Sequence, residues 1–386
     1  MTKPTVLILA ETFVPPPEVY VYRRTKYLRE LNPVVACFHR ANQEAYPFAH
    51  VHELRPFSPN IVAKGVNFLL RRMGLIHWDD SLEGIHRFRN LICEVKPDLI
   101  LCEGGYAAAS LIDRVLNTGL PFAVTFWGTD INAAKSIPKY FRKLTKVFEN
   151  GDMFIYCCNF LRRRGEDLGC PPENSVVINN GVEIPADPAW TPSPDGSFRL
   201  LSIARMSPVK GLDVLLRSVR RSLDSGVRVQ LTHVGSGRMS KETHALAEEL
   251  QLGEAVRFLG ALPNDEALAS CHQSDALVLS SVRCPNGDEE TFPTVLLEAG
   301  AHGLPVIASD IGGVADIVRH EQTGLLVPEG DPEALAAAIR RLADSAEEAR
   351  EFGMAGRRRV SQHFEVRSQV GAHESALLQL LEGAGH

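Results

Sequence analysis

The strongest constraint on this chain is a regular alternation of short apolar runs with segments of helical periodicity, interrupted once near the middle. The interruption, residues 184–196, contains four prolines and shows no apolar periodicity. Short apolar runs that alternate with helical patterns are typical of parallel strands joined by crossover helices. The chain is therefore predicted to be an α/β protein with two doubly wound parallel sheets, joined by a linker at 188–197.

The predicted strands form two series of six. In the first half they are Val6–Ala10, Val34–Phe38, Asp98–Cys102, Phe122–Phe126, Met153–Cys157 and Val176–Ile178. In the second half they are Phe198–Ala204, Val227–Val234, Val256–Leu259, Ala276–Leu279, Val306–Ser309 and Gly324–Val327. Asp331 followed by Pro332 predicts a capped helix start after the last of them.

Composition argues against several classes of protein. None of the apolar runs approaches the ~20 residues of a membrane span, and the first one is too short for a secretory signal. The formal net charge of -6 argues against a nucleic-acid-binding protein, which usually has a broad basic face. The eight cysteines are scattered without Cys-x-x-Cys spacing. We expect a cytoplasmic chain with reduced thiols, no metal site and no nucleic-acid partner.

A polar loop follows the predicted strand at 276–279 and leads into a helical pattern from about Pro293, a residue suited to a first helical turn. The free N–H groups of such a turn and the positive end of the helix dipole attract anions. Glu290 lies in the loop, and the side chain of Glu298 leans back toward the helix N-terminus. Amide donors for phosphate beside acids for hydroxyls fit a nucleotide-sugar.

The same stretch resembles a known family. Glu290 and Glu298, with seven residues between them, and the following Gly303-Leu304-Pro305-Val306-Ile307-Ala308-Ser309 resemble the signature of the family 4 retaining glycosyltransferases. Arg205-Met206-Ser207-Pro208-Val209-Lys210-Gly211 resembles the R-x4-K-G element of that family. The resemblance implies the GT-B fold, with two Rossmann-like domains facing across a cleft. Residues 1–187 would form the acceptor-side domain and 198–363 the nucleotide-sugar domain, with a last helix, 364–386, packing back on the first.

The resemblance also implies roles for single residues. Arg205 and Lys210 contact the departing diphosphate, Glu290 holds hydroxyls of the donor sugar, and Glu298 holds the ribose. The loop that receives the phosphates is Thr291, Phe292, Pro293, Thr294 and Val295. Outside this context, Arg205 and Lys210 would be interpreted as two solvated loop cations.

Three further residues border the nucleotide by resemblance: Gly235, Arg257 and Phe258. The Gly235-Ser236-Gly237 string does not complete a dinucleotide-binding fingerprint, because Ser240 stands where the third glycine belongs. The alternatives are glycines that serve a tight turn and a Phe258 that belongs to a core strand.

The first half follows the family less closely. The loop after its first strand, residues 11–20, has no glycine where family members carry a pair. Glu11-Thr12-Phe13-Val14, Phe126-Trp127-Gly128-Thr129-Asp130 and Leu168-Gly169-Cys170-Pro171-Pro172-Glu173-Asn174 nevertheless resemble the exopolysaccharide, colanic-acid branch.

Glu18, Trp127 and Asp130 are the acceptor-side candidates. Trp127 replaces a histidine of most relatives, so either that histidine is dispensable or an aromatic platform has taken its place. Asp130 orients an acceptor hydroxyl or serves as a helix N-cap.

We predict a retaining, metal-independent glycosyltransferase that uses a nucleoside diphosphate-sugar, UDP before GDP, and a glycan or lipid-linked acceptor in bacterial surface polysaccharide assembly. It needs no cofactor beyond the donor. A nucleotide-sugar epimerase of the same fold and a non-catalytic nucleotide-sugar-binding partner remain as alternatives. Two basic stretches, 64–72 and 135–146, either contact the inner face of the membrane peripherally or are solvated helix faces.

Overall fold

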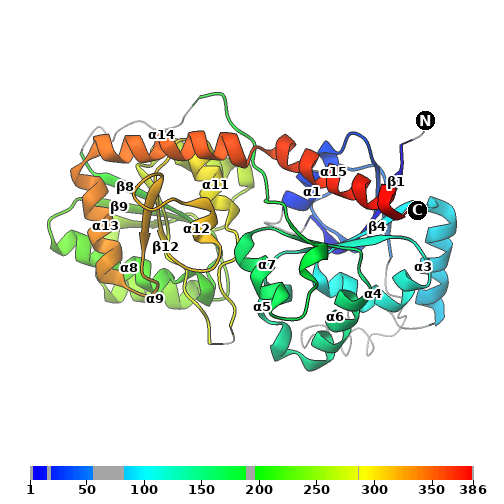
Figure 1. Ribbon diagram of the computed structural model, residues 1–386. Helices are drawn as coiled ribbons and strands as arrows, with labels where there is room; N and C mark the ends of the chain where they lie inside the picture. Colours follow the sequence, from blue (N-terminus) through cyan, green and yellow to red (C-terminus); the bar gives the residue numbers. More distant parts are fainter. Residues whose placement is uncertain (1–2, 15–18, 55–81, 188–195, 286, 385–386) are drawn as a thin grey trace. The chain divides into compact units, whose positions relative to one another are not determined.

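The computed structural model describes residues 3–14, 19–54, 82–187, 196–285 and 287–384. The chain forms two compact units, one comprising Met1–Asn179 with Val366–His386 and the other Asn180–Glu365 (Figure 1). The chain thus returns to its first unit with its last helix. Most of the predicted linker, residues 188–195, lies outside the described residues.

The first unit is built on a parallel sheet. Among its described residues, seven strands lie in the order β3-β2-β1-β4-β5-β6-β7. The strands are β1 (Thr5–Phe13), β2 (Asn32–Arg40), β3 (Val51–Glu53), β4 (Leu99–Glu103), β5 (Phe122–Phe126), β6 (Met153–Tyr156) and β7 (Ser175–Val177). The helices are α1 (Tyr20–Tyr27), α3 (Leu82–Val95), α4 (Gly105–Leu116), α5 (Thr129–Asn132), α6 (Pro138–Asn150), α7 (Asn159–Glu166) and α15 (Val366–Ala384). Every residue of β4 and β5 is buried, as is typical of parallel strands covered on both faces.

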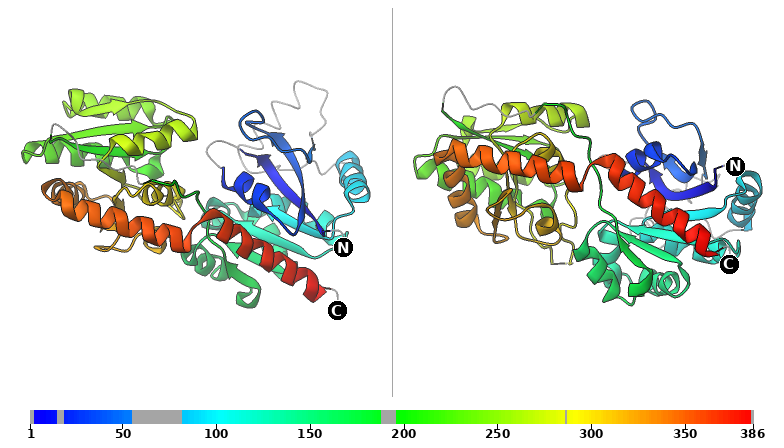
Figure 2. Two further views of the ribbon diagram at one scale, coloured as in Figure 1. Left: turned by 90° about the horizontal axis from the view of Figure 1, so that it is seen from above. Right: turned by 45° about the horizontal axis from the view of Figure 1, so that its top comes forward.

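The last helix, α15, is part of the first unit. Both views of Figure 2 show it, in red, beside α1, in blue. Oε1 of Glu374 accepts hydrogen bonds from three successive backbone N–H groups, those of residues 29–31, at 2.7 to 2.8 Å. Leu377 is fully buried in the core of the unit. A buried carboxylate and an apolar side chain therefore hold α15 to the end of α1.

The second unit repeats the plan. Six of its described strands lie in the order β10-β9-β8-β11-β12-β13, all parallel. The strands are β8 (Phe198–Ile203), β9 (Val229–Val234), β10 (Val256–Phe258), β11 (Ala276–Leu279), β12 (Val306–Ser309) and β13 (Gly324–Val327). The helices are α8 (Leu212–Asp224), α9 (Ser240–Glu249), α10 (Asn264–Ala269), α11 (Thr294–Ala301), α12 (Val314–Ile317), α13 (Pro332–Asp344) and α14 (Ala346–His363).

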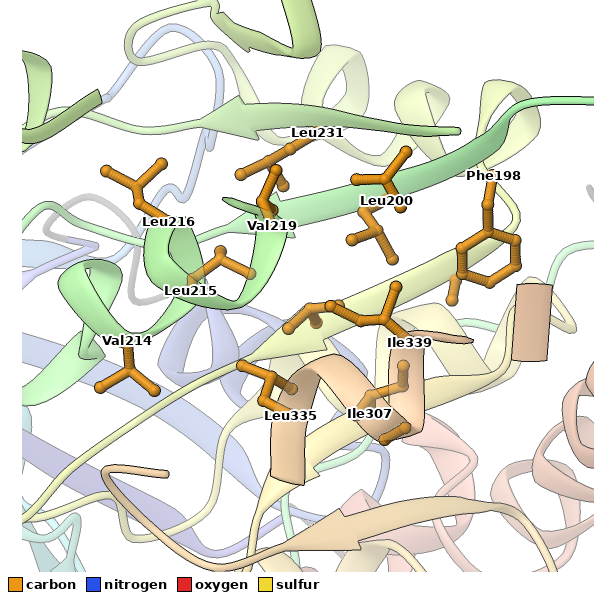
Figure 3. Packing of buried hydrophobic residues seen from close by; sticks show 14 of the residues in the cluster. Phe198, Leu200, Val214, Leu215, Leu216, Val219, Leu231, Ile307, Leu335 and Ile339 are labelled. Atoms are coloured by element: carbon orange, nitrogen blue, oxygen red, sulfur yellow. The ribbon is translucent and has the colours of Figure 1, made fainter. Parts of the chain in front are cut away.

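The core of the second unit lies between its sheet and two neighbouring helices. Figure 3 shows Leu215 of α8 with Leu335 and Ile339 of α13 beside Leu200 and Leu231 of the sheet. All five side chains are at most 2% exposed. Burial of this kind contributes roughly 1.5 to 3 kcal/mol per large aliphatic side chain and holds the strand ends in place.

Two helix starts can be compared with their predictions. The predicted cap at Asp331 is confirmed, because its carboxylate accepts hydrogen bonds from the N–H groups of Glu333 and Ala334 at 2.9 and 3.0 Å, with Pro332 in the first turn. The helix predicted from about Pro293 begins one residue later. Pro293 is its N-cap and has an extended backbone, with ψ of 103°.

In both sheets the direction of winding reverses beside the first strand of the unit. β1 lies between β2 and β4, and β8 lies between β9 and β11. Open parallel sheets bind ligands beyond the carboxyl ends of the strands at this reversal. No helix in the described part of the chain combines the length and the apolar character that crossing a membrane requires.

Candidate active site

The loops after β8 and β11 bring two predicted residues together. Lys210 ends a short 3-10 helix, Pro208–Lys210, and its Nζ is 2.5 Å from Oε2 of Glu290. The Ser281 hydroxyl donates to the same oxygen at 2.9 Å. The Lys210 and Glu290 side chains are 16% and 12% exposed. A cation and a carboxylate 80 residues apart in sequence thus meet at the point where the sheet reverses its winding.

A glycine allows these two loops to meet. Gly211, next to Lys210, has a left-handed backbone with φ of 54°, and a Cβ there would lie 2.1 Å from the carbonyl oxygen of Ser280. The Ser280 hydroxyl donates to the carbonyl of Gly211 at 2.9 Å. Since glycine adopts this conformation at little cost, the R-x4-K-G element ends in the residue that this contact requires.

Arg205 lies in a segment held by the loop after β9. The N–H of Met206 donates to the carbonyl of Ser236 at 3.0 Å. Gly235 has φ of 140°, and a Cβ there would lie 1.9 Å from the carbonyl oxygen of Ala204. Gly235, predicted to border the nucleotide, therefore permits close packing against the backbone next to Arg205.

Two adjacent glutamates in the loop after β11 have different surroundings. The Glu289 side chain is fully buried and accepts hydrogen bonds from Nη2 and Nε of Arg283 at 2.9 and 3.1 Å. Glu290 instead contacts Lys210 and Ser281. The two glutamates are adjacent in sequence, but their contacts differ. Glu289 is buried and holds Arg283, whereas Glu290 lies beside Lys210.

Asp288 is a charged neighbour that the sequence prediction missed. Burial and the negative charge of Glu290 raise the pKa of its carboxyl, while Lys210 and Arg205 oppose the rise. Two carboxylates and two cations therefore interact at this end of the sheet. The positive charges are partly balanced before any ligand arrives.

Helix α11 starts beside this cluster. The N-cap residue, Pro293, makes no side-chain cap hydrogen bond, and the N–H groups of Thr294 and Val295 lie in the first turn, at the positive end of the helix dipole. Glu298 lies one turn further and is 9% exposed. Its charge, after burial, contributes to raising the pKa of the Cys271 thiol to about 12.

Two other predicted loop residues are buried. Thr291 and Phe292 are 6% and 7% exposed, and the Phe292 ring lies 5.9 Å from that of Phe364. Their side chains are turned into the unit. Thr294 and Val295 are the first two residues of α11, and Pro293 is the N-cap before them.

Arg257 and Phe258 lie on the edge strand β10, two strands from β8. Arg257 is exposed, while Phe258 is half-buried with its ring 4.4 Å from that of His244 and 6.0 Å from that of His233. Packing in the sheet, the alternative interpretation of Phe258, accounts for its position. The structure does not bring either residue together with Lys210 and Glu290.

Trp127 and Asp130 follow β5 in the first unit. The Asp130 carboxylate is buried and accepts hydrogen bonds from the N–H groups of Gly105, Trp127 and Gly128 at 2.8, 3.1 and 2.9 Å. Gly128, and not Asp130, is the N-cap of α5. Asp130 therefore fixes the backbone of the Trp127 loop. Glu18 and residues 64–72 lie outside the described residues.

The sequence prediction also missed a polar group beside Trp127. Glu103 ends β4, at the winding reversal of the first sheet, and pairs with Arg24 of α1 at 3.0 Å. Gly104 and Gly105 follow it directly. The first sheet thus has a glycine pair after β4. The neighbouring strand is β1, and the loop after β1 has no glycine. A glutamate followed by two glycines at a strand end was the signal available in the sequence.

The chain forms two doubly wound units, and this arrangement defines the GT-B class of fold. In the second unit, charged side chains lie where the sheet reverses its direction of winding. The solved structure of HepE from Anabaena in complex with UDP superposes with a TM-score of 0.77 over 97% of this chain and 100% of that one, at 19% identity. The predicted fold class is confirmed.

The family follows from two matches. Residues 17–184 match the model for "Glycosyltransferase Family 4" and residues 184–359 that for "Glycosyl transferases group 1". Together they span most of the chain, which belongs to the family 4 glycosyltransferases. The resemblance that the motifs predicted is confirmed.

Two curated relatives come from polysaccharide biosynthesis. The putative colanic acid biosynthesis glycosyltransferase WcaL of Escherichia coli is 30% identical over 60% of this chain and 57% of its own length. The amylovoran biosynthesis glycosyltransferase AmsK of Erwinia amylovora is 28% identical over 69% of this chain and 66% of its own length. The chain thus spans less than two thirds of the length of either relative.

Proposed function

We propose that this protein is a retaining, metal-independent glycosyltransferase that moves a sugar from a nucleoside diphosphate-sugar to a glycan or lipid-linked acceptor in the assembly of a bacterial surface polysaccharide. The contact between Lys210 and Glu290 is the observation that carries the proposal. It joins a cation suited to phosphate and a carboxylate suited to hydroxyls, and the loop that carries Glu290 leads into α11, whose N-cap Pro293 makes no side-chain cap hydrogen bond. The names of the two curated relatives support the choice of pathway.

In the proposed reaction, the bond between the anomeric carbon and the diphosphate oxygen breaks while the acceptor oxygen bonds to the same face of that carbon. The departing diphosphate oxygen takes the acceptor proton, so no protein base is required. Negative charge grows on the diphosphate during this step. Arg205, Lys210 and the first-turn amides of α11 stabilise it, and such contacts act mainly in the transition state.

The carboxylates have separate roles in this proposal. Glu290 accepts hydrogen bonds from donor-sugar hydroxyls while remaining beside Lys210, and Glu298 accepts from the ribose hydroxyls. The donor carries UDP, as in the HepE complex. Four cationic or amide donors supply the charge that a metal ion supplies in other transferases, which is why the proposal includes no metal.

A thermal-shift titration tests donor binding directly. UDP, GDP, UDP-glucose, UDP-galactose and GDP-mannose are the probes, and a ligand at ~100 times its dissociation constant should stabilise the fold by about 2.7 kcal/mol. Lys210→Met should abolish most of this shift. Arg220→Met is the matched control, because Arg220 forms a surface pair with Asp224 within α8. A chain that none of the five probes stabilises would refute the proposal.

Product analysis separates the two alternatives. An epimerase would convert the nucleotide-sugar into an isomer without any acceptor, whereas a transferase releases the nucleoside diphosphate. A non-catalytic partner would bind the nucleotide-sugar and leave it unchanged. Mass spectrometry and anion-exchange chromatography of the reaction mixture distinguish all three outcomes.

A peripheral membrane contact forms part of the proposal, and α6 is the element that would make it. Its apolar residues Tyr140, Leu144, Val147 and Phe148 are buried in the first unit. Its cations are Lys139, Arg142, Lys143 and Lys146, and Lys146 pairs with Asp113. With the apolar face buried, binding must be electrostatic, at about 1 kcal/mol per cation near an anionic surface.

Flotation with phosphatidylserine vesicles tests this contact. Binding should be present at low salt, fall at high salt because exposed charges are screened, and weaken in the Arg142→Glu, Lys143→Glu double variant. Binding that is absent at low salt, or insensitive to salt, would instead favour the solvated helix face.

A further inference from the structure

A buried ion pair of the first unit has no part in the function proposed so far. Nη2 of Arg24 lies 3.0 Å from Oε2 of Glu103, 79 residues further along the chain, and the side chains are 11% and 2% exposed. Taking two charges out of water is costly, and an apolar pair of similar volume is often more stable. The residues that the pair touches therefore indicate a role beyond stability.

The pair lies against Trp127. The guanidinium carbon of Arg24 is 4.6 Å from the centre of the Trp127 ring. Tyr20, one turn earlier on α1, has its ring centre 4.2 Å from that of Trp127 at an interplanar angle of 38°. A cation over an indole face is attracted by the ring quadrupole, more strongly where water is excluded. Two side chains of one helix thus set the orientation of the indole.

The helix that carries Arg24 is itself anchored. Glu374 of α15 accepts the backbone N–H groups of residues 29–31, which fixes the end of α1. His373, the neighbour of Glu374, is buried, and burial and the charge of Arg24 hold its pKa well below its usual value. The neutral imidazole adds no repulsion to the guanidinium.

The Trp127 loop is fixed from its other side by the Asp130 carboxylate, which accepts the N–H of Trp127. The indole is nevertheless only partly buried. Oε1 of Glu103 and Nε of Arg24 have no hydrogen-bond partner among the described residues. The loop thus carries the Trp127 indole, which is partly exposed to solvent. The indole is held in place by Arg24, which is itself paired with Glu103.

We propose that Arg24, held by Glu103, is a positioning residue for the acceptor: it orients the Trp127 indole so that the indole's open surface receives a sugar ring of the acceptor. This inference rests on the proposed function, because Trp127 has a role only if the first unit binds the acceptor. It names the acceptor class as a glycan end with an apolar ring face. The pair acts through Trp127.

The kinetic test compares Arg24→Met, which keeps the length of the side chain but removes its charge, with Arg24→Lys, which keeps the charge. Acceptor probes are p-nitrophenyl glycosides, and the donor is UDP-glucose or UDP-galactose. Arg24→Met should raise the KM for the glycoside about tenfold, equivalent to about 1.4 kcal/mol. The KM for the donor should stay within about twofold of wild type, and Arg24→Lys should recover part of the loss. An equal rise in both KM values would overturn the proposal.

A spectroscopic test needs no acceptor. The chain has three tryptophans, so replacing Trp78 and Trp190 by Phe leaves Trp127 as the single reporter. Adding Arg24→Met should shift its emission to longer wavelength and increase quenching by acrylamide. Unchanged emission and quenching would overturn the positioning role. Wild-type protein that releases no UDP would defeat the proposed function, and in that case the fluorescence result still decides whether Arg24 orients Trp127.

Discussion

The adjacent glutamates of the loop after β11 offer the sharpest test of the site. Glu290→Gln removes a charge that the proposed transition state uses, whereas Glu289→Gln removes a charge that holds Arg283. The two substitutions are chemically identical and lie one residue apart. They should therefore separate catalysis from stability.

The structure sets the expected magnitudes. In Glu290→Gln the glutamine still accepts from Ser281, and the Asp288 carboxylate remains as a neighbour of Lys210, so the substitution should cost about 1 kcal/mol of stability. Its turnover should fall about a hundredfold, as for other single contacts to a developing charge. Glu289 is fully buried and accepts two hydrogen bonds from Arg283, so Glu289→Gln should cost about 1.5 to 3 kcal/mol of stability.

Two assays on the same preparations check these values. Differential scanning fluorimetry should show a lower Tm for Glu289→Gln, by about 2 to 4 °C per kcal/mol. Release of the nucleoside diphosphate, measured well below both midpoints, should be near wild type for Glu289→Gln and severely reduced for Glu290→Gln. The reasoning is refuted if Glu290→Gln turns over within threefold of wild type (roughly 0.6 kcal/mol) or if both activities simply follow the loss of Tm.

Three further outcomes follow from the second unit. Gly235→Ala should lower both the Tm and the affinity for UDP, because its Cβ would lie 1.9 Å from the Ala204 carbonyl oxygen. Gly226→Ala is the control: Gly226 has φ of 89° and open space around it, so this substitution should show only the cost of backbone strain. Equal losses in the two variants would contradict the role of close packing at Gly235. Asp331→Ala should lower stability by about 1 kcal/mol in urea titrations and leave turnover unchanged, since it removes only a helix cap. Burial lowers the pKa of His233 from 6.5 to about 4, so the unfolded chain binds the proton more tightly than the folded one. The free energy of unfolding should therefore be highest above pH 6.5 and should fall as the pH decreases toward 4. This fall should be less steep in His233→Gln. Parallel urea-midpoint profiles for wild type and His233→Gln would count against this last expectation.

The sequence by itself determined the fold class and most of the strands. The bounds of β5, β11, β12 and β13 agree with their predictions to the residue. Strands of a parallel sheet covered on both faces are continuous apolar runs, and their ends are marked by the polar loops that follow. The strand that the prediction missed, β3, has three residues, none of which is buried, so it carries no such signal.

Sequence motifs also located the loops of the candidate site, because each lies directly after an apolar run. The motif selected Glu290 by its spacing from Glu298, but only the structure shows that the side chain of its neighbour Glu289 is buried and holds Arg283. The same limit applies to Gly235, whose close partner, the carbonyl of Ala204, belongs to a different loop.

Only the tertiary structure decided which distant groups meet. The order of strands in the first sheet brings the ends of β4 and β5 beside α1, and this places Arg24 against both Glu103 and Trp127. Local sequence patterns depend on neighbours a few residues away, whereas these contacts depend on how strands and helices pack across the whole unit. The contacts around Trp127 were therefore the least predictable part of the first unit.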